Sequence, residues 1–417
     1  METLLVRGGH PLRGEVRVHG AKNSVLPILA ACVLCPEPCT VSRCPEISDV
    51  AVAEEILRHL GCTVRRRRDS ITVDAAALCR TEIPPCLMGK MRASVNFLGA
   101  LLGRMGTCEL SLPGGCDLGS RPIDFHIAAL EALGVEWEQC GTVLRFRWPH
   151  RRGGRVRLPY PSVGATENLL LAAVTVPEPV TVCNAAREPE ITDLCRFLRK
   201  LGARVEGEGG SILHVCGGRP LHGADHAVLP DRIETATYLA MTAGCGGQIR
   251  LTGTDARLLT PVLTVLERAG CRIEAAEDTI TLARECPLRG VGAVETAVYP
   301  GFPTDAQAPV MAALLRAAGE SRWTETVFCS RFSHVPQLRK FGASIRMEGS
   351  TAAVTGVESL HGAEASATDL RGGAGVLLAA MMAEGTSVIT CAERIRRGYA
   401  DLGRTLCALG AEVKFTV

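Results

Sequence analysis

The chain has 417 residues, enough for two or three domains, and 47% of them are apolar, which is ample for folded cores. Its 46 basic and 44 acidic residues leave a formal net charge of +2, and only 4% of the residues are aromatic. This balance excludes a disordered chain and argues against a nucleic-acid-binding protein, because it provides neither a strong positive field nor many stacking side chains.

The sequence shows neither a basic, apolar N-terminal leader nor an apolar run long enough to span a bilayer. We therefore expect a cytoplasmic protein without a membrane partner. Its 19 cysteines are scattered singly and not spaced as a disulfide framework, which fits a reducing compartment and small buried thiols. Cys32 and Cys35 form a C-x-x-C within an apolar helix. Because no second pair follows, we favour core packing there over zinc or redox chemistry.

A helix rich in Ala, Leu, Met, Gly and Ser recurs six times along the chain. Such helices are apolar nearly all round, so we expect them to be buried on every side. Each is followed by a short strand, such as 39–41 or 248–251, then by an amphipathic helix and a hairpin, such as 70–73 or 279–282. The six small-residue helices are predicted at 23–34, 93–104, 165–176, 233–243, 305–318 and 369–383.

Each amphipathic helix ends in Leu-Gly, Ala-Gly or Phe-Gly and runs directly into β-forming residues. A glycine at this place provides the left-handed conformation that helix C-caps favour. Successive glycines are 73, 68, 68, 72 and 68 residues apart, a spacing that indicates six copies of one supersecondary unit. The six are Gly61, Gly134, Gly202, Gly270, Gly342 and Gly410.

The one dense basic run, residues 65–68, follows the first of these glycines. It lies between the start of a predicted strand and Asp69-Ser70. We interpret it as the solvated edge of a hairpin and not as a nucleic-acid site.

Residues 111–122, Ser-Leu-Pro-Gly-Gly-Cys-Asp-Leu-Gly-Ser-Arg-Pro, are glycine-rich and carry one thiol, Cys116, and one guanidinium, Arg121. The glycines would let the backbone fold over a ligand, so we interpret the segment as a mobile lid with one reactive group. Arg121 would favour the thiolate and hold an anion beside it. The alternative is an ordinary surface loop with an inert cysteine.

The starts of the small-residue helices carry polar and charged residues. Helix N-termini present free N–H groups and a partial positive charge, so several of them facing one cleft would make an anion-binding basin. Each Asp or Ser at these starts, taken singly, is also explained as an ordinary N-cap. The cations expected to line the basin are Lys22, Arg92, Arg121, Arg371 and Arg397.

Six such units predict an α/β protein of two domains, each with three units, helices inside and sheets around them. A cleft between the domains would be the expected ligand site. The repeat pattern leaves the division open. Residues from about 22 to 229 form one domain and both termini build the other, or the domains follow one another with a boundary near Gly210.

Eight motifs stand in order along the chain: Gly-Ala-Lys-Asn-Ser, Met-Arg-Ala-Ser, Leu-Pro-Gly-Gly-Cys with Gly-Ser-Arg-Pro-Ile-Asp, Asn-Ala-Ala-Arg-Glu-Pro-Glu-Ile, Leu-Pro-Asp-Arg-Ile-Glu-Thr, Phe-Pro-Thr-Asp, Ala-Thr-Asp-Leu-Arg and Arg-Gly-Tyr. Together they resemble the UDP-N-acetylglucosamine 1-carboxyvinyltransferases, the enolpyruvyl transferase family that opens peptidoglycan precursor synthesis. The resemblance covers residues 1 to 417 without a missing repeat.

The resemblance implies two inside-out α/β domains, each of three repeated units with buried helices and surrounding sheets. Residues 1–21 and 230–417 form one domain and residues 22–229 the other, with hinges near 20–22 and 229–230. It implies transfer of the enolpyruvyl group of phosphoenolpyruvate to the 3-hydroxyl of UDP-N-acetylglucosamine, with release of phosphate. We expect a monomer whose partners are these two small molecules, with no metal or organic cofactor and no nucleic acid.

The resemblance also implies residue roles. Cys116 is the acid and can form a covalent adduct, Asp305 accepts the 3-hydroxyl proton, and Asp369 supports the reacting centre. Lys22 and Arg397 are catalytic and, with Asn23, Arg121 and Arg371, bind phosphoenolpyruvate. The implied UDP-N-acetylglucosamine contacts are Asn23, Arg92, Arg121, Pro122, Ile123, Asp124, Phe125, Ser162, Val163, Gly164, Asp305 and Val327.

Three positions depart from the family pattern: Ser48 and Tyr160 stand where some relatives have lysine, and Asn96 stands where some have tryptophan. These changes concern affinity for the diphosphate and uracil more than the chemistry. One alternative function is the sister enolpyruvyl transfer to shikimate 3-phosphate, against which the Gly-Gly-Cys segment argues. The other is a catalytically silent paralogue that binds UDP-sugars, against which the complete catalytic set argues.

Overall fold

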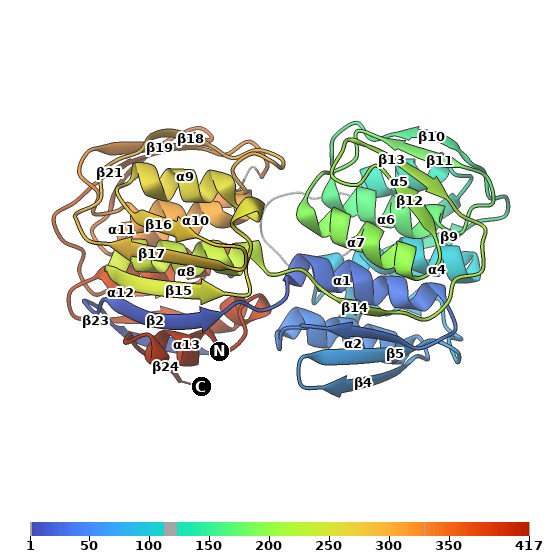
Figure 1. Ribbon diagram of the computed structural model, residues 1–417, viewed down its shortest axis with the longest axis horizontal. Coiled ribbons are helices and arrows are strands. Elements are labelled where there is room, and N and C mark those ends of the chain that lie inside the picture. The colour runs from blue at the N-terminus through green and yellow to red at the C-terminus, as the bar shows by residue number, and fades with distance from the viewer. Residues whose placement is uncertain (1, 112–122, 329, 417) are drawn as a thin grey trace. The chain divides into compact units, whose positions relative to one another are not determined.

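The computed structural model describes residues 2–111, 123–328 and 330–416. The chain forms two compact units (Figure 1). The first unit takes the chain up to His19 and again from Pro230 onward, and the second takes the described residues from Gly20 to Leu229. Within the described ranges the chain therefore passes between the units at residues 19–20 and 229–230.

The second unit contains three repeats in sequence. The first has α1 (Lys22–Ala31), η1 (Cys32–Leu34), β3 (Cys39–Ser42), α2 (Ser48–His59), β4 (Thr63–Arg67) and β5 (Ser70–Asp74). The second has β6 (Glu82–Ile83), α3 (Pro85–Met88), η2 (Arg92–Asn96), α4 (Phe97–Met105), β7 (Thr107–Ser111), α5 (Asp124–Glu131), β8 (Glu136–Cys140) and β9 (Val143–Arg147). The third has β10 (Gly154–Arg157), α6 (Val163–Ala173), β11 (Val180–Cys183), α7 (Pro189–Lys200), β12 (Arg204–Glu206) and β13 (Ile212–Cys216), and β14 (Asp225–Ala227) follows it.

The first unit repeats this plan around β1 (Thr3–Arg7) and β2 (Leu12–Arg17). Its first repeat has α8 (Arg232–Cys245), β15 (Gly247–Thr252), η3 (Ala256–Leu258), α9 (Thr260–Arg268), β16 (Arg272–Ala275) and β17 (Thr279–Arg284). The next has β18 (Gly292–Glu295), α10 (Thr304–Ala313), β19 (Glu320–Thr324), η4 (Arg331–His334), α11 (Val335–Arg339), β20 (Ser344–Glu348) and β21 (Thr351–Thr355). The last has β22 (Glu364–Ser366), α12 (Leu370–Met382), β23 (Thr386–Thr390), η5 (Ala392–Arg397), α13 (Leu402–Ala408) and β24 (Glu412–Thr416).

Every repeat contributes to a four-stranded sheet of one design. The second unit has the sheets β14-β3-β5-β4, β6-β7-β9-β8 and β10-β11-β13-β12, and the first has β16-β17-β15-β2, β18-β19-β21-β20 and β22-β23-β1-β24. In four of these sheets the two strands that flank a buried helix in sequence pair in parallel. In five of them a hairpin completes the sheet by antiparallel pairing. In the last sheet β1 pairs with β24, Thr3 opposite Thr416, so the two chain ends lie together in the first unit (Figure 1).

The two strands that lie next to the chain passages, β2 and β14, do not pair with the strand that follows them in sequence. Strand β2 precedes α1 in sequence but pairs with β15, whereas β14 precedes α8 but pairs with β3. The first unit therefore needs its N-terminal segment to complete the sheet of β15, and the second unit needs its last strand, β14, to complete the sheet of β3.

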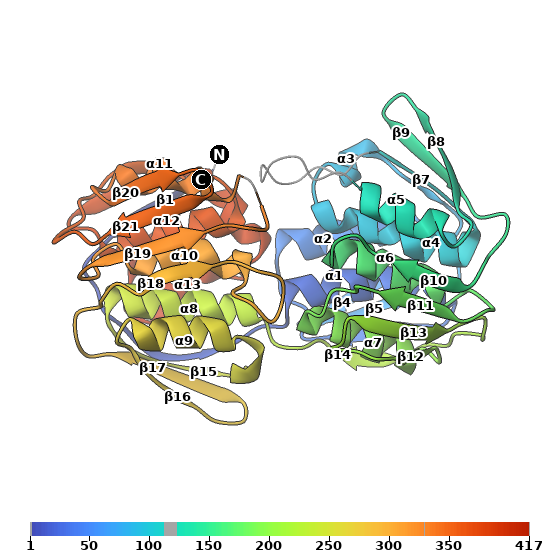
Figure 2. The same ribbon diagram turned by 90° about the horizontal axis from the view of Figure 1, so that it is seen from above.

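The small-residue helices are buried, as predicted. In the first unit α10 packs against α8 and α12, and strands lie around them (Figure 2). In the second unit α4 packs against α6 and α1. Glycine permits one close approach there, since a Cβ on Gly99 would lie 2.3 Å from the carbonyl oxygen of Asn168. The predicted inside-out α/β class is confirmed.

The six repeat glycines all have positive φ, between 90° and 106°, so the predicted helix C-caps are confirmed.

The basic run is confirmed as a hairpin edge, with β4 at the edge of its sheet and Arg66 paired with Glu54 at 2.8 Å. Two helices stop before their predicted ends: α6 stops at Ala173 and not at 176, and α10 stops at Ala313 and not at 318. Single hydrogen bonds between residues three apart replace the helical ladder there, and Gly319 turns the chain with a φ of +96°.

The cysteines of the described residues are free thiols, and many of them are buried. Burial raises the pKa of Cys44 and of Cys245 to about 12. Thiols of this kind are protonated at neutral pH and serve as core residues. The C-x-x-C pair, Cys32 and Cys35, is likewise buried.

Within the part of the chain that the structure describes, no helix has both the length and the apolar character that crossing a membrane requires.

Candidate active site

Three helices of the first unit begin with an aspartate at or near the first turn. The Asp231 carboxylate caps α8 by accepting from the N–H groups of residues 233 and 234, and Asp369 caps α12 by accepting from those of Arg371 and Gly372. Helix α10 has no side-chain cap, because Pro303 precedes it. Its first-turn carboxylate, Asp305, is held by arginines instead.

The Asp305 carboxylate lies between two buried guanidinium groups. Arg331 Nη2 donates to Asp305 Oδ1 at 2.7 Å, and Arg371 Nη2 lies 3.6 Å from Oδ2. Arg331 also donates to the carbonyl oxygen of Thr304 from Nε and Nη2, at 3.0 and 2.8 Å. The two guanidinium groups hold the carboxylate from both oxygens and fix its orientation at the helix N-terminus.

Arg371 is 3% exposed and stands over the ring of Tyr399, with its Cζ atom 5.2 Å from the ring centroid. Tyr399 is also buried, and its hydroxyl lies 2.8 Å from Thr237 Oγ1 on α8. Although burial opposes the charge, Tyr399 and Asp305 raise the pKa of Arg371 above its ordinary value. Among the described residues Arg371 Nε and Nη1 have no hydrogen-bond acceptor. These N–H groups of a buried, permanently charged side chain are therefore available to an anionic ligand.

Asp369 has further partners around the start of α12. Its Oδ2 atom accepts from the hydroxyls of Thr368 and Ser333 at 3.2 and 3.5 Å. His334, fully buried beside it, has a pKa lowered to about 4 by burial, so this imidazole is neutral at physiological pH. The His334 Nδ1 atom lies 3.1 Å from the carbonyl oxygen of Arg331, which ties this segment to the partner of Asp305.

Val327 and Arg397 belong to segments that are fastened to the starts of α10 and α12. The buried carboxylate of Glu325 accepts from Val327 N at 2.8 Å and from Thr304 Oγ1 at 2.9 Å. Arg397 is half-buried at the end of η5, which packs on α12. The structure thus brings Asp305, Asp369, Arg371, Val327 and Arg397 to one region of the first unit.

In the second unit the predicted residues lie at the starts of other helices. Lys22 opens α1, and its Nζ atom is 2.8 Å from Asp49 Oδ2 at the start of α2. Both side chains are largely buried, 11% and 3% exposed, so the pair is a buried ammonium and carboxylate. Asn23 beside them is half-buried.

The other predicted residues of the second unit gather where α5, α6 and η2 begin. Ser162 caps α6 by accepting from the N–H of residue 165 at 3.4 Å, and a Cβ on Gly164 would meet His126 of α5 at 2.9 Å. Asn96 of η2 donates to Glu167 of α6 at 2.8 Å. The predicted residues at these starts are Arg92, Ile123, Asp124, Phe125, Ser162, Val163 and Gly164.

Three predicted site residues, Cys116, Arg121 and Pro122, lie outside the described residues. The structure adds residues that the sequence did not single out: Arg331, Glu325 and Asp49. Their contacts join positions far apart in sequence, so spacing offers no signal for them. The aspartate in the first turn of α2, a common position for acidic residues, is the one sequence hint.

The departures have distinct surroundings. Ser48 begins α2 next to Asp49, Tyr160 is 38% exposed, and Asn96 is bonded to the buried carboxyl of Glu167. Burial raises the pKa of Glu167 to about 8, although the Asn96 bond opposes the shift. The side-chain amide of Asn96 is therefore the hydrogen-bond donor to the buried carboxyl group of Glu167.

Glu167 makes stability depend on pH. Between about pH 4.5 and 8 the folded protein holds a proton that the unfolded chain has released, so stability falls as pH rises through this window. Glu167→Gln can keep the Asn96 bond but cannot titrate. We expect the wild-type melting temperature to drop more than that of the variant between pH 5 and 8. Parallel profiles would show that Glu167 is already ionised at pH 5.

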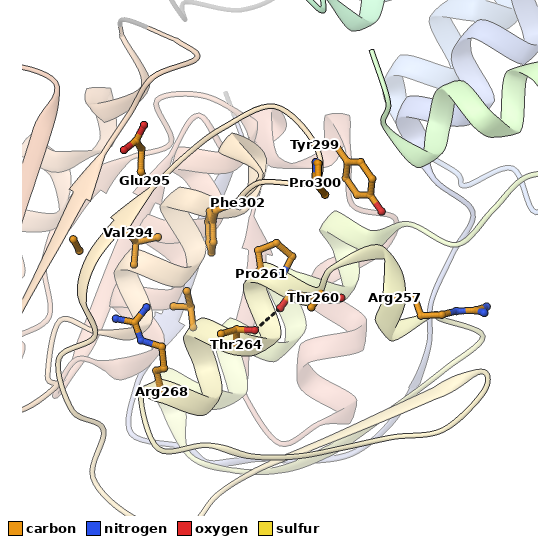
Figure 3. A pocket seen from close by; sticks show the side chains of 12 residues that line it. Arg257, Thr260, Pro261, Thr264, Arg268, Val294, Glu295, Tyr299, Pro300 and Phe302 are labelled. Atoms are coloured by element: carbon orange, nitrogen blue, oxygen red, sulfur yellow. Dashed lines mark hydrogen bonds between the residues drawn. The ribbon is translucent and has the colours of Figure 1, made fainter. Parts of the chain in front are cut away.

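A separate pocket of about 480 Å³ lies on the first unit between α9, β18 and the loop that leads into α10 (Figure 3). Pro261 and Phe302 contribute apolar surface, and Arg257, Arg268 and Tyr299 contribute polar groups (Figure 3). The predicted site residues do not line it.

Among the described residues no three His, Cys, Asp or Glu side chains cluster closely enough to hold a metal ion.

Comparison with known proteins matches residues 6–406 to the EPSP synthase (3-phosphoshikimate 1-carboxyvinyltransferase) family. A UDP-N-acetylglucosamine 1-carboxyvinyltransferase 2 of Caldanaerobacter subterraneus is 41% identical over 98% of both chains. A UDP-N-acetylglucosamine 1-carboxyvinyltransferase of Zymomonas mobilis is 42% identical over 99% of both. Among solved structures, the enolpyruvyl transferase NikO from Streptomyces tendae has a TM-score of 0.89 at 28% identity, covering 100% of this chain and 99% of its own.

Proposed function

The chain belongs to the EPSP synthase family of enolpyruvyl transferases, and on that premise we propose that it transfers the enolpyruvyl group of phosphoenolpyruvate to the 3-hydroxyl of UDP-N-acetylglucosamine and releases inorganic phosphate. The relatives that share about two-fifths of its residues carry this acceptor in their names. The same activity would place the protein in the cytoplasm, at the first committed step of peptidoglycan precursor synthesis. It would act as a monomer without a metal or organic cofactor.

One observation carries the proposal: the buried guanidinium of Arg371, with Nε and Nη1 donors that have no acceptor among the described residues, stands beside the Asp305 carboxylate at the start of α10. Phosphoenolpyruvate bears a phosphate and a carboxylate, and both need donors placed in advance. The unused N–H groups of Arg371 would serve one of them. Arg397, on a segment fastened to α12, would serve in the same clamp.

The reaction needs three proton and bond changes. The methylene carbon of phosphoenolpyruvate gains a proton, the sugar 3-oxygen adds to the resulting cationic centre, and phosphate then leaves as a proton is lost again from the methyl group. We assign the first proton to Cys116. Asp305, paired with Arg331 and Arg371, orients the 3-hydroxyl and takes its proton late, as the bond to the cationic centre forms.

The second unit would supply the remaining contacts. Lys22 and Asn23, with Arg121, are assigned to phosphoenolpyruvate, and Lys22 would exchange part of its pairing with Asp49 for the substrate anion. Arg92, Pro122, Ile123, Asp124, Phe125, Ser162, Val163 and Gly164 are assigned to the nucleotide sugar, as are Asn23, Arg121, Asp305 and Val327. The function therefore requires residues of both units to act on one pair of substrates, with the two chain passages at 19–20 and 229–230 serving as hinges.

Phosphate release separates the possible acceptors. With phosphoenolpyruvate present, we expect release with UDP-N-acetylglucosamine and none with shikimate 3-phosphate. Release with shikimate 3-phosphate alone would establish the sister activity. Binding of the nucleotide sugar without release from either acceptor would establish a silent paralogue.

Cys116 should be the thiol alkylated by an epoxide phosphonate such as fosfomycin. The phosphonate imitates the phosphate of phosphoenolpyruvate, so the clamp would hold the epoxide near this thiol, whereas the buried cysteines are protonated. Peptide mass analysis after treatment should find one adduct, on Cys116, and none in Cys116→Ala. Labelling of a different cysteine would contradict the assignment.

A further inference from the structure

Asp193 on α7 is a buried carboxylate to which no role has been assigned. It is 2% exposed and accepts three hydrogen bonds from three different segments. Its Oδ2 atom accepts from Ser24 Oγ and from Leu229 N, the latter at 3.1 Å, and its Oδ1 atom lies 3.0 Å from His226 Nε2. A carboxylate is buried at a cost in free energy that such bonds must offset, so the three donors are held firmly.

The donors belong to the two places where the chain enters and leaves the second unit. Ser24 lies in the first turn of α1, three residues after the N-cap residue of that helix. Leu229 is the last residue of the second unit before the chain returns to the first unit. Leu229 also accepts from Ala21 N through its carbonyl oxygen at 2.8 Å. His226 is on β14, the strand that completes the sheet of β3 from the far end of the sequence. Asp193 thus joins both chain passages.

The start of α1 depends on this connection. The N-cap residue of α1 is Ala21, whose side chain cannot cap the helix, so the first turn has its backbone hydrogen bonds to Ala21 O but no local side-chain cap. The bond from Ser24 to Asp193 fixes it to α7 instead. The preceding residues, Lys22 and Asn23, are the ones assigned to phosphoenolpyruvate.

We infer that Asp193 is a positioning residue, which sets the first turn of α1 through Ser24 and thereby places Lys22 and Asn23 for phosphoenolpyruvate. The inference rests on the proposed function. Asp193 need not touch the substrate, and its effect passes through the hydroxyl of Ser24 and the anchored Leu229 backbone. His226, packed edge-on against Phe197 with ring centroids 5.5 Å apart, holds the other carboxylate oxygen in place.

Asp193→Ala is the main test. It leaves the three donors without their acceptor, and we expect kcat/KM for phosphoenolpyruvate to fall by roughly tenfold to a hundredfold, chiefly through a higher KM. Asp193→Asn is the conservative variant. Its amide oxygen can still accept from Ser24 and Leu229 if His226 moves its ring proton to Nδ1, so it should restore most of the loss.

Three further single variants separate positioning from folding. Ser24→Ala removes one bond, and we expect a smaller rise in KM that adds nothing in the Ser24→Ala/Asp193→Ala double variant. Leu213→Ala destabilises the buried core strand β13 away from the network and should lower the melting temperature without changing KM. Asp225→Asn, an exposed aspartate on β14, is the surface control.

An unchanged KM in Asp193→Ala, or losses in Ser24→Ala and Asp193→Ala that multiply in the double variant, would overturn the inference. If Asp193→Ala does not fold, the comparison of Ser24→Ala with Leu213→Ala decides in the same way. A wild-type protein that releases no phosphate would refute the proposed function and this inference together. An active wild type with an indifferent Asp193→Ala would refute the inference alone.

Discussion

Arg371→Met should lower kcat/KM for phosphoenolpyruvate by roughly 10²–10³, the range seen when one preorganised donor to a developing anion is removed. Methionine fills a similar volume but offers no donor, so the substrate anion loses the Nε and Nη1 donors that have no acceptor among the described residues. The variant also removes the Arg371 guanidinium from Asp305 while leaving the hydrogen bond from Arg331 in place. Steady-state kinetics with varied phosphoenolpyruvate measures the loss.

The matched control for Arg371→Met is Arg322→Met. Arg322 is partly exposed on β19, with 41% of its side chain accessible, and it pairs with Glu320 and Glu348 at the surface. Surface ion pairs contribute little, and we expect rates close to wild type. Arg371→Lys should recover only part of the activity, because an ammonium cannot reproduce a planar fork of donors. An Arg371→Met enzyme with wild-type kcat/KM would remove this residue from the site.

Asp305→Asn should lower kcat by roughly 10²–10⁴ through the loss of a positioned proton acceptor. The amide keeps the size of the side chain and can still accept from Arg331, so the start of α10 should persist. We expect KM for UDP-N-acetylglucosamine to change much less than kcat, because the variant removes a group needed for the chemical step. Rapid-quench measurement of product formation would separate chemistry from product release.

Asp255→Asn is the control for Asp305→Asn. Asp255 accepts from both Arg257 Nε and Nη2 at the surface start of η3, and so resembles Asp305 in being paired with arginine. It has no part in the assigned site. A fall in kcat in this control, or none in Asp305→Asn, would contradict the role given to Asp305.

Local sequence rules predicted most of the fold. The six glycines ended their helices because only a left-handed residue fits there, and the small-residue helices were buried because they have no polar face. The end of α10 was missed because apolar residues continue past Ala313 while the backbone already turns. The pairings of β2 with β15 and of β14 with β3 also have no local signal, because the paired strands are far apart in the sequence.

The site was predictable only where single motifs carry it. Asp305, Asp369 and Arg371 follow turn signals at helix starts, so their clustering could be expected from the repeat. Arg331 reaches Asp305 across 26 residues of sequence, and Lys22 reaches Asp49 from another helix. Such pairs arise from tertiary packing, and sequence spacing cannot reveal them. The contacts of Asp193 have the same origin, since Ser24 lies 169 residues away from it.

The central claim is that Lys22 of one unit and Asp305, Arg371 and Arg397 of the other act on the same substrates. The most direct test is a crystal structure of the protein with UDP-N-acetylglucosamine after reaction with fosfomycin. We predict the phosphonate on Cys116 in contact with both Lys22 and Arg397, and the sugar 3-hydroxyl within hydrogen-bond distance of Asp305. A phosphonate that contacts residues of one unit only, with Asp305 remote from the sugar, would contradict the account.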